Sequence, residues 1–271
     1  MQIKLRWLGN AGFEFHFGNT VLLVDPFLTR PRPSALYFGR TPSDLQAIAA
    51  HADKGDHILV THSHFDHFMD VPSIAKRSGA VIHGSPNTCV IAGKLGIPEN
   101  QLHLINAGDE FEIADICVKT IRAAHPFIPG YTNGRLRENL TEPLRLHDYR
   151  MDSCLSFLIK WQAARILVWS STHINDAPPA DVLICRSVSS QRWYDAIFKA
   201  VNPRWFIPAH WDDMFHPLCY PVRPFLTAPR LAFPPLQHIS LERLAGRIEK
   251  ANPESHFMAP ERFQQEILYI P

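Results

Sequence analysis

The chain has 271 residues, of which 46% are hydrophobic and 20% are charged. That length suffices for one large domain or two small ones, and the composition excludes an intrinsically disordered chain. Lys and Arg total 27 against 26 Asp and Glu, giving a formal net charge of +1. The charge therefore predicts no general binding to nucleic acid or to an anionic membrane surface.

The predicted elements of the first half alternate strands with helices. Apolar residues alternate with polar ones in the first strands, which are joined by a turn at Gly9-Asn10. The segment from Arg30 to Pro42 is rich in proline and arginine and is predicted to be a loop. Strands are predicted at 3–7, 13–17, 20–24, 57–60 and 80–83, and helices at 71–76 and 87–95.

The second half contains more strands and a long aperiodic segment. Strands are predicted at 111–113, 116–123, 154–161, 165–169, 180–185 and 204–208, and helices at 190–201 and 241–250. Residues 126–150 show no periodicity, and a loop of this length is usually functional or mobile, so we treat it as a candidate lid. Residues 215–271 begin with recurring prolines and are predicted to be a C-terminal extension packed on a single domain, 1–271.

The five cysteines are scattered and include no C-x-x-C pair. This pattern argues against a disulfide framework or a cysteine zinc site, and favours buried thiols in a reducing compartment. The opening MQIKLRWLGNAGFEF follows a strand pattern rather than that of a signal peptide, and no apolar run reaches membrane-spanning length. We expect a cytoplasmic protein without membrane insertion.

The stretch THSHFDHFMD places three histidines and an aspartate within six positions, directly after a buried strand. His62 and His64 alternate and therefore point the same way, so one metal ion could take both rings. Asp66 and His67 begin a predicted helix and could turn toward a second position. A lone histidine is usually a surface residue, but such a cluster seldom serves packing. Imidazole and carboxylate are ligands for zinc, and also for manganese or iron.

Two further histidines share this context. His125 follows the strand at 116–123, and His210 follows the strand at 204–208. Side chains at strand ends can converge on one edge of a sheet, which is how active sites are usually assembled.

These motifs resemble those of the metallo-β-lactamase-fold hydrolases. The H-x-H-x-D-H run from His62 to His67, His125 and the Ile-Pro-Ala-His sequence ending at His210 carry the resemblance. The opening WLGNAG and the later LVDPF are similar to the branch that includes ascorbate-6-phosphate lactonase and the N-acyl-phosphatidylethanolamine phospholipase D enzymes. The first motif is specific, whereas the flanking matches are supportive.

The resemblance implies an α/β fold, namely a four-layer αββα sandwich with a metal site at one edge between the sheets. It also implies two metal positions, each with three ligands. The first would use His62, His64 and His125, and the second Asp66, His67 and His210.

One departure from the family pattern concerns the aspartate that bridges the two ions in a Gly-Asp-Thr step. The corresponding stretch here reads WSSTH, so Ser171 stands in the bridging position. A neutral hydroxyl offsets none of the charge between two dications, and the second metal should bind more weakly. His173, Asp176 or Asp212 could substitute. A single ion held by the first three histidines and a water is equally consistent.

The family-like mechanism uses a metal-activated water on a small ester, lactone, amide or phosphodiester. Asp66 would orient the water and pass a proton to the leaving group. The alternative is a catalytically altered or inactive metal-binding or ligand-binding protein, because of Ser171. Asp25 is a candidate for holding a histidine ligand by its other ring nitrogen, although a turn-forming aspartate before Pro26 fits nearly as well.

The substrate is expected to be a small molecule, and the arginines of the candidate lid could meet an anionic group. Trp211, adjacent to His210, and His147 in the loop are predicted to contact it. Neither a large insertion nor a basic run is present, so nucleic acid is not an expected partner. A homo-oligomer is compatible with the sequence.

Overall fold

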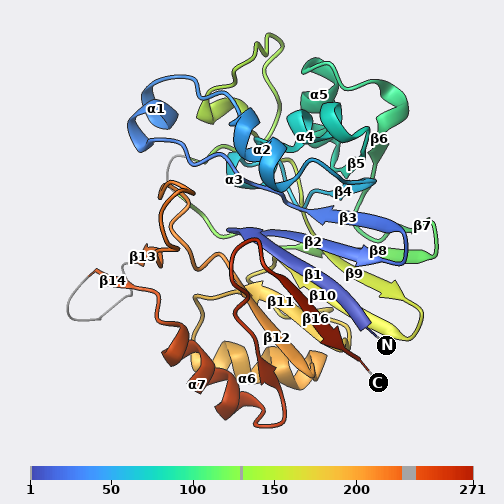
Figure 1. Cartoon of the computed structure of the whole chain (residues 1–271), viewed down its shortest axis with the longest axis vertical. Helices are drawn as coiled ribbons and strands as arrows, with labels where there is room; N and C mark the ends of the chain where they lie inside the picture. Colours follow the sequence, from blue (N-terminus) through green and yellow to red (C-terminus); the bar gives the residue numbers. More distant parts are fainter. Residues whose placement is uncertain (1, 129–130, 228–235, 271) are drawn as a thin grey trace.

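Two seven-stranded β-sheets dominate the computed structural model, which describes residues 2–128, 131–227 and 236–270 (Figure 1). The first sheet has the order β16 (Gln265–Tyr269), β1 (Gln2–Gly9), β2 (Gly12–Phe17), β3 (Thr20–Val24), β4 (His57–Leu59), β5 (Val81–Gly84) and β6 (Leu102–Leu104). The second has the order β15 (His256–Phe257), β12 (Trp205–Ala209), β11 (Val182–Arg186), β10 (Ala164–Trp169), β9 (Cys154–Trp161), β8 (Ile116–Ala123) and β7 (Glu110–Ile113). A short pair, β13 (Leu226–Thr227) and β14 (Gln237–His238), stands apart.

The main hydrophobic core lies between the two sheets. Alternation directs Ile3, Leu5 and Trp7 of β1 inward, where none of the three is exposed. On β2 the rings of Phe13, Phe15 and Phe17 stack in sequence and join the same core. The period-two pattern of the sequence therefore forms the inner faces of the sandwich.

Helices cover the two outer faces. Against the first sheet pack α1 (Pro33–Phe38), α2 (Leu45–His51), α3 (Phe65–Phe68), α4 (Val71–Ser78) and α5 (Pro86–Lys94). Against the second pack α6 (Gln191–Val201) and α7 (Leu241–Ala251). Two 3-10 turns, Glu99–Gln101 and Leu146–Asp148, complete the elements. The layers confirm the predicted αββα sandwich (Figure 1).

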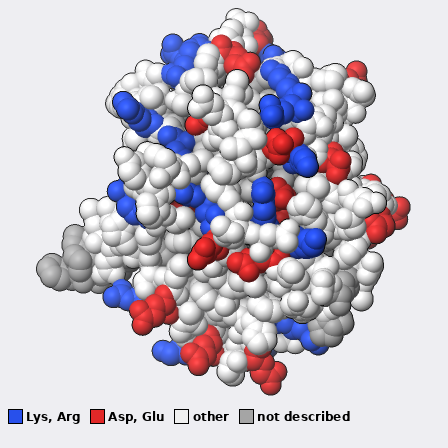
Figure 2. Space-filling view, viewed as in Figure 1, with Lys and Arg blue, Asp and Glu red and all other residues white. Residues whose placement is uncertain are grey.

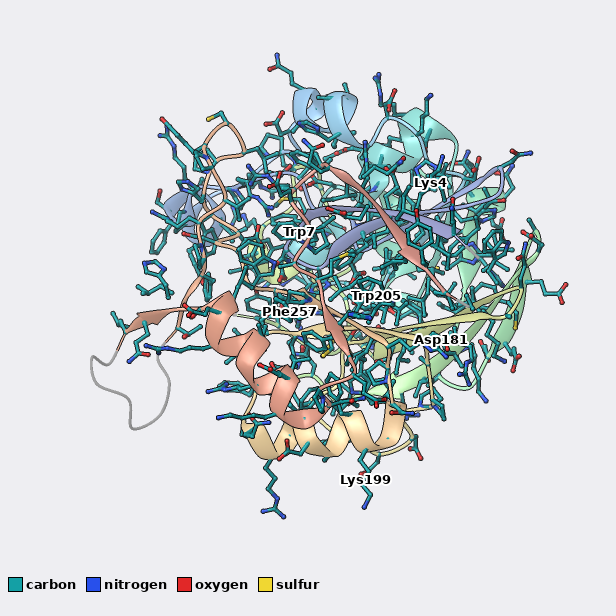
Figure 3. The ribbon with its side chains drawn as sticks, turned by 60° about the horizontal axis from the view of Figure 1, so that its bottom comes forward. Lys4, Trp7, Asp181, Lys199, Trp205 and Phe257 are labelled. Carbon is teal, nitrogen blue, oxygen red and sulfur yellow. The ribbon has the colours of Figure 1, made fainter. Side chains whose placement is uncertain are left out.

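Helix α6 shows how the sequence builds an outer layer. Tyr194, Ile197 and Val201 recur at helical spacing and are buried, whereas Lys199 projects from α6 away from the body (Figure 3). The Ser190 hydroxyl caps the helix by accepting a hydrogen bond from the backbone of Trp193.

Two segments differ from their sequence-based prediction. The predicted loop from Arg30 to Pro42 contains α1, because Pro33 is tolerated at the first position of a helix, where no backbone N–H is needed. The segment 215–271 also supplies edge strands to both sheets, with β16 pairing with β1 and β15 with β12. Short strands of this kind depend on distant partners and leave little local pattern.

The cysteines are all free, but only three are buried. Cys219 is exposed and Cys117 is partly exposed, so the prediction of buried thiols is wrong for these two. Cys117 lies on β8 between the buried Ile116 and Val118, so alternation turns its side chain to the outer face of the sheet.

Charges of both signs are interspersed over the face shown in Figure 2, with no patch of one sign dominating it. Within the described ranges, no helix is long and apolar enough to cross a membrane.

Candidate metal centre

The strand ends that carry the predicted ligands meet at one edge of the sandwich. In the second sheet, β8, β10, β11 and β12 run in the same direction, because β9 is antiparallel to both β8 and β10. Their carboxyl ends therefore share an edge, and His125 and His210 follow two of them. In the first sheet, the loop after β4 carries the H-x-H-x-D-H run and continues into α3.

The structure brings the six predicted side chains into two groups of three. Within each group the ligating atoms lie within 4.8 Å of one another. The first triad is His62, His64 and His125, and the second triad is Asp66, His67 and His210. The first triad takes two side chains from the loop after β4 and the second takes two from α3, and each is completed by a residue that follows a strand of the second sheet.

In the first triad an oxygen holds one nitrogen of each imidazole. His62 Nδ1 lies 3.0 Å from the Thr61 hydroxyl, and His64 Nε2 lies 3.2 Å from Asn133 Oδ1. His125 Nδ1 lies 2.7 Å from the carbonyl of the next residue. Each bond fixes the ring and leaves its other nitrogen available to a metal ion.

In the second triad Asp25 holds a histidine as predicted from sequence. His67 Nδ1 lies 2.7 Å from Asp25 Oδ2, and the other oxygen of Asp25 accepts a hydrogen bond from the Thr61 backbone at 2.7 Å. The other nitrogen of His67, Nε2, then lies 3.1 Å from His210 Nε2. The carboxylate thereby sets the orientation of one ring toward the rest of its triad.

Three buried atoms of the triads that could ligate a metal ion lack a hydrogen-bond partner within the described part of the chain. They are His62 Nε2, His64 Nδ1 and Asp66 Oδ1. Leaving such atoms buried without a partner costs free energy, and a cation between them removes that cost. Imidazole nitrogens and a carboxylate oxygen are donors that divalent transition metals accept. These residues fit a metal centre.

The electrostatics of three histidines favour the neutral form that a metal requires. Burial lowers the pKa of His62 well below its ordinary value, and neighbouring histidines lower it further. Burial also lowers the pKa of His64 to about 4 and that of His210 to about 3. At neutral pH these three rings carry no proton that would compete with a metal ion.

The remaining two members of the second triad form a charge-coupled pair. Burial acts to lower the pKa of His67, but the carboxylates of Asp25 and Asp66 offset it and raise the pKa overall. Burial acts to raise the pKa of Asp66, but His67 and the other histidines nearby lower it overall. Asp66 is therefore an ionised carboxylate in a buried position.

Ser171 is buried at the strand end where the family pattern expects a bridging aspartate. Its hydroxyl oxygen accepts hydrogen bonds from the backbone N–H groups of Ala124, at 3.0 Å, and His173, at 3.1 Å. Ser171 therefore joins the two neighbouring loops of the second sheet through these two bonds.

The three proposed substitutes for the bridge also lie outside the triads. His173 and Asp176 have exposed side chains. Asp212 is buried, but one of its oxygens accepts a hydrogen bond from the Asn10 backbone at 2.8 Å and the other pairs with Arg30 at 3.1 Å. Among the described residues, none of the three supplies a ligand atom to either triad.

Asn10 connects two members of the second triad and was not identified from sequence. Its side-chain amide donates to the backbone carbonyl of Asp66 at 2.9 Å, and its own carbonyl accepts from the backbone of His210 at 3.1 Å. Asn10, Asp25 and His210 all adopt positive φ angles, of 52°, 43° and 55°. Such backbone conformations cluster at functional sites.

A cavity of about 400 Å³ opens over the triads. It is lined by side chains of both triads, by Tyr131 of the candidate lid and by Arg186 at the end of β11. Sequence analysis missed these last two residues. Arg186 shares with His125 and His210 a place at a strand end, which is the signal that could have identified it.

Tyr131 packs edge-on against His64 of the first triad, with ring centroids 4.7 Å apart. Burial raises the pKa of its hydroxyl, and the Asp66 carboxylate raises it further. Tyr131 therefore keeps its proton at neutral pH and can act as a hydrogen-bond donor.

The two residues predicted to contact substrate lie elsewhere. Trp211 is buried in the core between the sheets and stacks on Trp7, with ring centroids 4.8 Å apart. The His147 ring contacts Arg137 at 2.9 Å. Neither Trp211 nor His147 lines the described cavity.

Comparison with known proteins agrees with this geometry. A family model described as the metallo-beta-lactamase superfamily matches residues 13–122. A UPF0173 metal-dependent hydrolase of Pyrobaculum arsenaticum is 37% identical over 113 residues, covering 42% of this chain and 46% of the relative. A UPF0173 metal-dependent hydrolase of Myxococcus xanthus is 32% identical over 123 residues, covering 45% of this chain and 39% of the relative. The chain spans about half the length of the curated relatives it matches.

Solved structures share the fold at low sequence identity. Igni18, a metallo hydrolase of Ignicoccus hospitalis, is 14% identical, with a TM-score of 0.66 over 100% of both chains. CmlA, a diiron beta-hydroxylase of Streptomyces venezuelae, is 15% identical, with a TM-score of 0.58 over 99% of this chain and 54% of that one. The chain therefore shares the fold of these structures, and its residues 13–122 match the model of the metallo-beta-lactamase superfamily.

Proposed function

We propose that this protein is a metal-dependent hydrolase of a small ester, lactone, amide or phosphodiester. The observation that carries the proposal is the pair of triads, whose unpartnered buried donor atoms lie beside a cavity large enough for a small molecule. The names of the similar UPF0173 proteins support it.

The donor set suits zinc, and also manganese or iron. The first triad offers three imidazole nitrogens, and the second offers two nitrogens and one carboxylate oxygen. When bound, such an ion supplies a Lewis acid that acidifies water and polarises a carbonyl or phosphoryl oxygen.

Asp66 is the residue we assign to proton transfer. Its carboxylate is ionised, lines the cavity and keeps Oδ1 free of hydrogen bonds within the described residues. It can therefore accept a proton from the attacking water and return it to the leaving group. Tyr131, which stays protonated beside Asp66, can donate a hydrogen bond to the substrate.

Ser171 bears on how many ions this function uses. A neutral hydroxyl whose oxygen already accepts two backbone hydrogen bonds provides no bridging charge. We therefore propose that the second triad binds its ion more weakly than the first. The same feature favours a second candidate, a metal-binding or ligand-binding protein without hydrolytic activity.

Turnover after metal reconstitution separates the two candidates. Protein stripped by a chelator would be reloaded with zinc, manganese or iron and assayed on a panel of aryl esters, lactones, amides and phosphodiesters. We expect metal-dependent turnover, with Asp66→Asn lowering kcat/KM by about 10²- to 10⁴-fold. His147→Ala, outside the cavity, is the matched control. Metal uptake without turnover across the panel would refute the hydrolase and leave the binding protein.

A further inference from the structure

We propose that the substrate of this site is amphipathic, with an apolar group seated against the outer cavity wall and an anionic group at Arg186. The inference rests on the proposed function, because it takes the triads as the end of the cavity where the reaction occurs. It adds a substrate class, which neither the ligand set nor the fold specifies.

Apolar side chains from four separate parts of the chain form most of the cavity wall away from the triads. Helix α1, the candidate lid, the ends of β10 and β11, and the C-terminal segment all contribute. Among them are Tyr37, Ile128, Val168, Ile184, Phe225 and Ile239. Together these side chains form an apolar surface, which offers few hydrogen bonds to a polar substrate.

Three polar side chains of that wall have partners in the protein. The Ser187 hydroxyl donates to the carbonyl of Ala209 at 2.6 Å, and the Thr227 hydroxyl donates to the carbonyl of Gln237 at 3.1 Å. Asp212 is paired with Arg30. A substrate rich in hydroxyl or amide groups would leave many of them unpaired against this wall, at a cost in binding free energy.

Arg186 is the one Lys or Arg among the described residues that line the cavity. Its Nε and Nη2 atoms donate to the carbonyl of Val188 at 3.0 and 2.8 Å, which holds the guanidinium in place and leaves Nη1 for a ligand. Arg186 lines the same cavity as His125 of the first triad and His210 of the second. An anionic group held by Arg186 therefore lies in the cavity that contains both triads.

The apolar wall continues to the surface of the molecule. Three of the residues that line the cavity are large hydrophobics left exposed, namely Tyr37 at 50%, Val188 at 43% and Ile128 at 36%. An apolar group that enters along them stays in contact with apolar surface from the mouth of the cavity inward.

Calorimetric binding of a homologous series tests both halves of the inference. Metal-loaded protein would be titrated with n-alkyl carboxylates from butanoate to octanoate. We expect each added methylene to lower Kd about three- to fourfold, as for a methylene removed from water. Arg186→Gln should raise every Kd about tenfold without changing the dependence on chain length, because it removes a charged hydrogen bond.

Matched surface variants locate the apolar contact. Val188→Asp should flatten the chain-length dependence, whereas Val90→Asp, a similarly exposed valine on α5, should leave it unchanged. No binding, or a Kd independent of chain length in the unmodified protein, would overturn the apolar assignment. A Kd unaffected by Arg186→Gln would overturn the anionic one. If binding depended on chain length but no substrate were turned over, only the hydrolase proposal would be refuted. If substrates were turned over but binding did not depend on chain length, only this inference would be refuted.

Discussion

The molecule contains two clusters of histidines, and they differ in where their nitrogen atoms point. In the metal centre, one nitrogen of His62 or His64 contacts an oxygen and the other has no partner within the described structure. The second cluster is His57, His83 and His103 on β4, β5 and β6. There His57 Nδ1 lies 3.0 Å from His83 Nε2, and His83 Nδ1 lies 2.7 Å from His103 Nδ1.

The difference shows that a high local density of imidazoles does not by itself make a metal site. The central ring of the second cluster uses both of its nitrogens on neighbouring rings, and it stacks on Phe111 with ring centroids 5.1 Å apart. It therefore joins three adjacent strands. In the first triad, by contrast, His62 and His64 each keep one ring nitrogen without a partner in the described part of the chain.

Metal content is the strongest test of this distinction. We expect His62→Ala to remove the ion of the first triad and His67→Ala that of the second, whereas His83→Ala should retain the full content. Elemental mass spectrometry on the purified, metal-loaded variants measures the number of metal ions per chain. Loss of metal in His83→Ala would contradict the distinction between the clusters. One equivalent, lost only with His62→Ala, would establish a single ion.

A smaller effect is expected from the carboxylate that orients His67. Asp25→Asn keeps the shape of the side chain but removes the charge on the partner of His67 Nδ1. Metal affinity should fall about 10- to 100-fold, as is usual when such an orienting group is changed. Competition with a chromogenic chelator measures the change, with Asp176→Asn at an exposed position as control. Unchanged affinity would show that packing alone orients the ring.

The second cluster, His57, His83 and His103, should make the folding stability of the protein depend on pH. Burial, assisted by His103 and His57, lowers the pKa of His83 to about 3 in the folded protein, against 6.5 for an ordinary histidine. Only the unfolded chain therefore takes up this proton as the pH falls below about 6.5, and folding stability is lost in that direction. Between pH 7 and pH 5 the loss from His83 is about 2 kcal/mol.

Substitution isolates that contribution from those of the other buried histidines. In urea denaturation, the fall in free energy of unfolding between pH 7 and pH 5 should be about 2 kcal/mol smaller for His83→Phe than for the unmodified protein. The exposed His173→Gln is the control. Equal falls for His83→Phe and the unmodified protein would mean that the chain of rings is protonated without loss of structure.

The parts of the fold and site that sequence predicts are those with a local signal. Alternating apolar residues indicated the main strands, and the H-x-H-x-D-H run indicated four candidate ligands in one segment, which the structure divides between a loop and α3. Asn10 and Arg186 lack such a signal, because their roles depend on contacts between segments far apart in the chain. The same holds for β15 and β16, which are defined by their partner strands.

The position of Trp211 shows a finer limit of local inference. The residue follows His210 directly, yet it stacks on Trp7 between the sheets while His210 faces the cavity. The backbone turns at His210, whose φ is 55°, directly after β12 ends, so proximity in sequence to a candidate ligand does not place Trp211 on the same surface. Asp212, one residue further on, is engaged by Arg30 rather than by a metal ion.

Each triad crosses from one sheet of the sandwich to the other. The loop after β4 supplies two candidate ligands to the first triad and α3 supplies two to the second, and His125 or His210 completes each from the opposite sheet. Bound ions would thus act as cross-links between the two sheets at the edge where the cavity opens. Because an ion that binds only the folded state adds stability by mass action, the rigidity of this edge would follow the supply of metal in the protein's surroundings.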